Sequence, residues 1–131
     1  LIVALTHLKV SKIIVSNRSN DKAIELKKKF PFIDLANWGQ LQDFDMIINA
    51  TSIGLNRDDK IPINFNNTKS GRLFYDIIYN PKETNFLIEA KKEGNIIQNG
   101  KMMFLYQAQL AFELWLNIKP EVNEEVIKLV E

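Results

Sequence analysis

The order of apolar and polar residues along the chain alternates between short strand-like runs and longer helix-like patterns. Runs rich in β-branched and other apolar residues are typical of buried strands. They predict five strands, at residues 12–16, 32–35, 45–50, 72–78 and 95–98. Apolar residues at helical spacing predict a helix remnant near the start and four further helices. These cover residues 1–8, 21–30, 84–92, about 100–117, and from Pro120 onward.

Strands that alternate with helices predict an α/β fold with a parallel sheet covered on both sides. Right-handed crossovers between short strands lead to a Rossmann-like, doubly wound, mostly parallel sheet with C-terminal helices. A polar stretch, residues 56–71, interrupts the alternation and is typical of a loop. Ligands of such folds gather at the carboxyl ends of the strands, so the residues that follow each strand are the candidate site.

Composition narrows the function classes. The chain has 131 residues, a net charge of +1, one His and no Cys. Disulfides, thiol nucleophiles and cysteine zinc sites are therefore excluded, no metal site is expected, and a reducing, cytoplasmic setting fits. A charge near zero offers no general attraction for nucleic acid or membrane surfaces. No apolar run approaches the roughly 18 residues that span a bilayer.

The first candidate follows the first predicted strand, where Asn17, Arg18 and Ser19 open a helix with Lys22 one turn further on. A helix start offers unpaired N–H groups and a positive dipole end, and two cations and a hydroxyl join them here. The group suits a phosphate monoester, and an Arg at this place suits the 2′-phosphate of NADP. An ordinary helix start with surface cations is the alternative.

Two further candidates follow later strands. The strand at 45–50 leads into the candidate string Asn49-Ala50-Thr51-Ser52-Ile53-Gly54, whose small residues let a ring or a backbone approach closely. An ordinary turn is the alternative. Asp76 falls on a buried strand and needs a partner, so a structural hydrogen-bonding role is favoured over catalysis. Tyr79, at the end of the same strand, can present its phenol to a ligand.

The long helix carries one anomaly. Helical spacing puts Gln107 on one face with Met103, Ala111 and Leu114, which predicts an amide on an otherwise apolar, buried stripe. Buried amides need hydrogen-bond partners. The partner is either backbone or the hydroxyl of a ligand, and the sequence leaves both open.

The order and spacing of these strings indicate a family. SNRS with Lys22, then INATSIGL, then FYDIIYNPKETNFL, then QNGKMMFLYQAQLAFELW together resemble the C-terminal cofactor domain of shikimate dehydrogenase. The resemblance runs from about Leu1 to Trp115. The YDxxYNPxxTxxL and NGxxMxxxQAxxAFxxW patterns carry most of its specificity.

The resemblance implies reversible reduction of 3-dehydroshikimate to shikimate with NADPH, in aromatic amino-acid biosynthesis. It implies that Tyr79 and Gln107 contact the substrate. It also implies a cofactor-binding set of Asn17, Arg18, Ser19, Lys22, Ala50, Thr51, Ser52, Ile77, Gly100 and Met103. Of these, the first four match positions that recognise the 2′-phosphate, and family members often have Thr where this chain has Ser19.

Some parts of the family pattern have no counterpart here. The family's proton-transfer Lys and Asp belong to a preceding substrate domain, so no catalytic residue is expected in this chain. Aligning LIVALTHLKVSKIIV with the family places Leu1 inside the first helix, beyond the first strand and the glycine-rich pyrophosphate turn. We therefore expect a partial NADP-binding domain at 1–131. It should be inactive alone, bind cofactor weakly and self-associate through the edge beside residues 12–16.

Three alternatives remain. A broader quinate/shikimate dehydrogenase that uses NAD is one, although Arg18 and Lys22 favour NADP. A similar cofactor domain occurs in glutamyl-tRNA reductase, but the Tyr79-Asn80-Pro81 and Gln107-Ala108 strings do not suit it. The third is a non-catalytic nucleotide-binding module.

Overall fold

A computed structural model describes residues 1–130. Contacts divide the chain into two compact units, which we describe separately. Unit 1 comprises Leu1–Asp43 and Pro62–Asn64, and unit 2 comprises Phe44–Ile61 and residues 65–130. Both are α/β units in which every strand pairing is parallel, as the sequence predicts.

Unit 1 carries two strands and two helices. In chain order they are α1 (Ile2–His7), β1 (Ile14–Ser16), α2 (Asn20–Lys29) and β2 (Asp34–Ala36). Val15 lies opposite Leu35 in the β1–β2 ladder, and α2 packs on β2. The buried side chains are Ala23 of α2 and Ile33, which precedes β2. This packing sets the start of α2 directly after the carboxyl end of β1.

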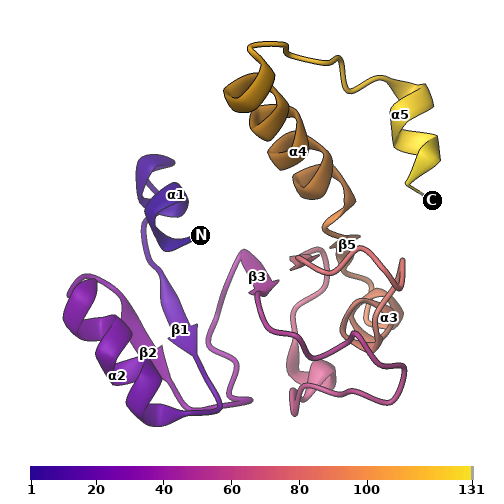
Figure 1. Ribbon diagram of the computed structural model, residues 1–131. Helices are drawn as coiled ribbons and strands as arrows, with labels where there is room; N and C mark the ends of the chain where they lie inside the picture. The colour runs from indigo at the N-terminus through magenta and orange to yellow at the C-terminus, as the bar shows by residue number, and fades with distance from the viewer. Residues whose placement is uncertain (131) are drawn as a thin grey trace. The chain divides into compact units, whose positions relative to one another are not determined.

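Unit 2 holds a three-stranded sheet in the order β3-β4-β5, of which β3 and β5 are labelled in Figure 1. Its strands are β3 (Met46–Asn49), β4 (Leu73–Asp76) and β5 (Ile96–Gln98). Its helices are η1, a 3-10 turn (Phe65–Asn67), α3 (Asn85–Lys92), α4 (Lys101–Leu116) and α5 (Glu124–Leu129). The helix α3 packs on β4 and β5. Thr84 caps α3, as predicted, by accepting a hydrogen bond from the Leu87 amide at 3.5 Å.

Phe74, at the centre of β4, is fully buried and forms the core of unit 2. Its ring centroid lies 5.6 Å from Phe44, 5.9 Å from Phe65 and 5.3 Å from Phe86 of α3. Aromatic pairs at such spacings contribute about 0.5–1.5 kcal/mol each beyond their buried area. The cluster clamps α3 to one face of the sheet and so brings the start of α3 to the strand ends.

The helix α4 differs from its prediction. Leu105 is its one buried residue within the described range, whereas Tyr106, Leu114 and Trp115 are 52%, 83% and 79% exposed. The expectation of a buried apolar stripe along Met103 and Leu114 is therefore wrong in this structure. Apolar residues occur on all sides of α4, so periodicity alone does not identify the side that packs.

Two smaller expectations also need correction. The last helix begins at Glu124 and not at Pro120, because the Asn123 side chain caps it by accepting from the Val126 amide at 3.1 Å. The strands form two hydrogen-bonded sheets, β1-β2 and β3-β4-β5, where a single sheet was expected. Within residues 1–130, no helix has both the length and the apolarity needed to cross a bilayer.

Candidate functional site

The residues singled out from the sequence lie in both units. Asn17, Arg18, Ser19 and Lys22 belong to unit 1, and the other eight belong to unit 2. Each group follows the carboxyl end of a strand.

The unit 1 group surrounds the first turn of α2. Ser19 is the N-cap of this helix, and its hydroxyl makes no capping hydrogen bond. The Asn17 amide donates to the Ser19 carbonyl oxygen at 3.1 Å, which fixes the turn. Arg18 and Lys22 are exposed, and neither pairs with a carboxylate within residues 1–130. The exposed Asp21 is the one acidic residue of that first turn.

This arrangement suits a phosphate group. Two cations, a hydroxyl and the first N–H groups of a helix all belong to residues 18–22, and each favours an anion. Asp21 opposes an anion, so the two cations must outweigh it. The chemistry that these groups support is the binding and recognition of an anion.

The end of β3 presents residues alternately outward and inward. Ala50 and Ser52 are exposed, whereas Thr51 is half-buried. The Thr51 hydroxyl donates to Asn49 Oδ1 at 2.8 Å and accepts from the Ile53 amide at 3.0 Å. The Thr51 side chain is therefore engaged within the protein, which leaves Ala50, Ser52 and the backbone to meet a ligand.

Asp76 closes β4 with a fully buried carboxylate. It accepts hydrogen bonds from the Asn49 side-chain amide at 3.1 Å, from the Ile78 backbone N–H at 3.0 Å and from the Thr84 hydroxyl at 2.6 Å. These donors meet the requirement that a buried charge be hydrogen-bonded. The predicted structural role of Asp76 is confirmed, since its carboxylate is buried and hydrogen-bonded within the protein.

Ile77 and Gly100 lie side by side at the ends of β4 and β5. The Gly100 amide donates to the Ile78 carbonyl oxygen at 3.1 Å. A Cβ atom on Gly100 would overlap the Ile77 carbonyl oxygen, although the Gly100 φ of −78° is available to any residue. Glycine is therefore required here by the close approach of two backbone segments and not by its φ.

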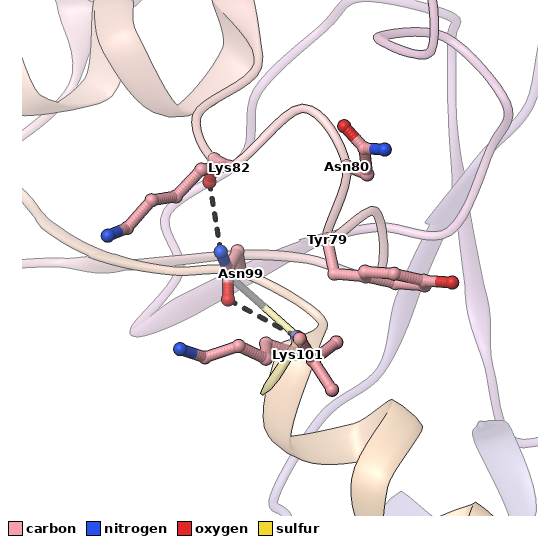
Figure 2. Close-up of a pocket in the computed structure, with 6 residues that line it drawn as sticks. Tyr79, Asn80, Lys82, Asn99 and Lys101 are labelled. Carbon is pink, nitrogen blue, oxygen red and sulfur yellow. Dashed lines mark hydrogen bonds between the residues drawn. The ribbon is translucent and has the colours of Figure 1, made fainter. Parts of the chain in front are cut away.

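Tyr79 stands two residues beyond Ile77. Its ring stacks on Phe104 of α4 with centroids 4.6 Å apart, and 38% of the residue stays exposed. A hollow of about 200 Å³ lies beside it, lined by Tyr79, Asn80, Lys82, Asn99, Lys101 and Val130. Figure 2 shows Lys82 and Lys101 projecting to one side of the hollow and the Tyr79 ring to the other.

Asn99 ties the parts of this hollow together, and the sequence reasoning missed it. Its side-chain amide donates to the Lys82 carbonyl oxygen at 3.0 Å, and its Oδ1 accepts from the Lys101 amide at 3.2 Å (Figure 2). The signal was present in the Asn99-Gly100 pair, since Asn commonly bonds to the backbone two residues on.

Met103 and Gln107 lie one turn apart on α4, close in sequence to Phe104. Met103 is 37% exposed, and Gln107 is exposed and makes no hydrogen bond to any residue in 1–130. The prediction that Gln107 is buried is wrong, because the stripe on which it lies faces outward. An exposed amide needs no internal partner and is accessible to a ligand.

The loop that follows β3 is anchored on α3. Asp59 accepts from the Gly54 and Asn56 amides at 3.2 Å each, and these bonds lower the pKa of its carboxyl. Asn85, the first residue of α3, donates to the Asp59 carbonyl oxygen at 3.1 Å.

On the sheet itself, burial raises the pKa of the Tyr75 phenol. In the part of the chain that the structure describes, no three His, Asp or Glu side chains form a metal-binding group.

The parallel α/β architecture, with its polar and small residues at the strand ends, defines a Rossmann-like domain class. No family model matches the chain. A shikimate dehydrogenase (NADP(+)) of Pelagibacter ubique is 56% identical over 131 residues, which are all of this chain and 49% of the relative. The chain thus spans about half the length of the curated relatives it matches.

Solved structures agree with this relationship. A crystal structure of a shikimate dehydrogenase in complex with NADP+ matches with a TM-score of 0.77 and 34% identity, over 91% of this chain and 45% of that one. The Thermus thermophilus enzyme in complex with NADP(H) and shikimate matches with a TM-score of 0.78 and 28% identity, over 92% and 46%. Over the half that it covers, the chain belongs to the shikimate dehydrogenase family.

Proposed function

We propose that this chain is the cofactor-binding part of an NADP-dependent enzyme that reversibly reduces 3-dehydroshikimate to shikimate. The observation that carries the proposal is the pair of unpaired cations, Arg18 and Lys22, at the start of α2 after β1. A doubly wound fold recognises the ribose of a dinucleotide at this place, and cations there select the 2′-phosphate.

The remaining residues fit such a cofactor. Ala50 and Ser52 are exposed at the end of β3, and such small side chains let a ring approach closely. The contact of Gly100 with Ile77 brings together two backbone segments proposed to meet the nicotinamide carboxamide. When bound, the cofactor supplies the hydride, and these residues hold its ring in place. Met103 lies nearby in sequence, at the first turn of α4.

Tyr79 and Gln107 are the proposed substrate contacts. Both are exposed, and the Tyr79 ring is oriented by its stacking on Phe104. A phenol and an amide both donate and accept hydrogen bonds, which suits a ligand rich in hydroxyl groups. The proton donor is assigned to no residue of this chain.

The two-sheet topology supports the proposal that residues 1–131 are a partial domain. In the doubly wound strand order 3-2-1-4-5-6, strand 1 lies between strands 2 and 4. A chain that supplies strands 2 to 6 alone then forms one two-stranded and one three-stranded sheet. The pairings β1-β2 and β3-β4-β5 fit this order.

A chimera tests the proposed function. The half of the Pelagibacter relative that this chain does not match, fused ahead of residues 1–131, should oxidise NADPH when 3-dehydroshikimate is added. The 131-residue chain alone should not. A folded but inactive chimera, or an active isolated chain, would contradict the proposal. Assaying shikimate and quinate side by side separates the strict enzyme from the broader quinate/shikimate alternative.

A further inference from the structure

Asn49, the last residue of β3, is 3% exposed and has all its side-chain hydrogen-bonding groups engaged. Its Nδ2 donates to both carboxylate oxygens of Asp76 at 3.1 Å and to the Ile53 carbonyl oxygen at 2.9 Å. Its Oδ1 accepts from the backbone N–H of Thr51 at 3.1 Å and from its hydroxyl at 2.8 Å. One amide therefore folds residues 51–53 back onto the end of the strand.

The anchor of this amide is independently fixed. Asp76 also accepts from the Ile78 amide and from the hydroxyl of Thr84, the N-cap of α3. The carboxylate consequently holds its place through β4 and α3. Asn49 links the segment beyond β3 to that carboxylate. Ile77 directly follows Asp76 in the chain, so the same anchor fixes its position.

We propose that Asn49 is a positioning residue for the cofactor. By bridging Asp76 and Thr51, it holds the Ala50–Ser52 segment in register with Ile77, so that both meet the nicotinamide part together. This inference rests on the proposed function. It is specific to an amide, since a carboxylate at position 49 would face Asp76 and an apolar side chain would satisfy none of these groups.

A matched pair of variants tests the inference. Asn49→Ala and Thr84→Ala each remove a buried donor to Asp76, but only the first also releases residues 51–53. In ¹⁵N-labelled protein, hydrogen exchange at the Thr51 and Ile53 amides and NADPH titration are measured on the same samples. Exchange is compared with that of the Phe74 amide, which reports overall stability.

Asn49→Ala should speed exchange at Thr51 and Ile53 beyond the change at Phe74 and weaken NADPH binding by about tenfold. Thr84→Ala should leave both within a few-fold of wild type once overall stability is matched. Equal effects of the two variants, or an unchanged NADPH affinity in Asn49→Ala, would overturn the inference.

Two safeguards keep the test decisive. If Asn49→Ala does not fold, Thr51→Val removes the hydroxyl link while leaving the contact between Asn49 and Asp76. It should then weaken NADPH binding, and an unchanged affinity would count against the inference. If the wild-type protein does not bind NADPH at millimolar concentration, the proposed function is refuted. Hydrogen exchange at the Thr51 and Ile53 amides would still decide whether Asn49 holds the segment.

Discussion

At the scale of single residues, a few residues have unusual surroundings. Arg18 and Lys22 are exposed cations that pair with no described carboxylate, beside a capping hydroxyl that makes no capping bond. Gly100 is buried against a carbonyl oxygen that leaves no space for a methyl group. Each feature leads to a prediction that concerns that residue alone.

Replacing Arg18 by Asp should shift the preference of the chain from NADPH toward NADH. The change removes a charge-assisted contact to the 2′-phosphate and adds a repulsion, which together should weaken NADPH binding by about tenfold or more. Parallel titrations with the two cofactors measure the shift. Lys28→Asp, with the same charge change at the far end of α2, is the control and should leave the preference intact.

Gly100→Ala should destabilise unit 2 by about 1–3 kcal/mol, because the added methyl forces Gly100 and the Ile77 carbonyl apart. Urea unfolding measures the loss. Gly71→Ala is the control. Open space surrounds Gly71, so the added methyl would meet no atom, and the only strain in the variant would come from the positive φ of 76°. If Gly100→Ala matched the control in both stability and NADPH binding, the close approach would have no functional consequence.

At the scale of elements, ion pairs and caps fix the pieces that carry the site. In unit 1, Asp34 at the start of β2 lies 3.2 Å from Lys12 and 3.7 Å from Lys27 of α2. These links join β2 to the segment that leads into β1 and to the helix whose start is the proposed phosphate site. Their strength depends on the ionisation of one carboxyl.

The pKa of Asp34 should lie below its ordinary value of 3.8, chiefly because Lys12 donates a hydrogen bond to the carboxylate and attracts its charge. A lowered pKa in the folded state means a stabilisation that is complete above the ordinary pKa and is lost as the pH falls through the folded value. NMR titration of the carboxyl measures it. Lys12→Ala should raise this pKa and Lys28→Ala should not; equal effects would contradict the assignment.

The elements also show what could be predicted from sequence. The strands at 12–16 and 45–50 were predictable because consecutive β-branched residues favour strand over helix. The start of α5 was not predictable. Pro120 suits a helix start, but the helix begins after Asn123, whose side chain caps it. The exposure of Gln107 was not predictable either, since periodicity defines a face but not its partner. Asn49 belonged to a candidate string in the sequence, but its hydrogen bonds to Asp76 and Thr51 join segments that only the fold brings together.

At the scale of the whole molecule, the chain exposes much apolar surface. Among the described residues, Leu114 and Trp115 of α4 are 83% and 79% exposed, and Leu8 is 74% exposed. Monomeric proteins rarely leave large apolar patches uncovered. The curated relatives are about twice as long as this chain, so surface that is exposed here has additional sequence available to cover it in those proteins.

The isolated chain should therefore self-associate as its concentration rises. Sedimentation velocity over a concentration series measures this. Leu114→Glu with Trp115→Glu should reduce association if α4 is the contact, whereas Val15→Lys should reduce it if the edge beside β1 is the contact, as the sequence suggested. A monomer at the highest concentration would refute the prediction for both surfaces.

The central proposal is that this chain recognises NADP through Arg18 and Lys22 at the start of α2. The most direct test is an NMR titration of the ¹⁵N-labelled chain with NADPH and, separately, with NADH. We expect NADPH to shift the amide signals of Arg18 and Ser19 in unit 1 and those of Ser52, Ile77 and Gly100 in unit 2. NADH should leave the signals of Arg18 and Ser19 almost unmoved. No shifts at these residues, or identical shifts with both cofactors, would contradict it.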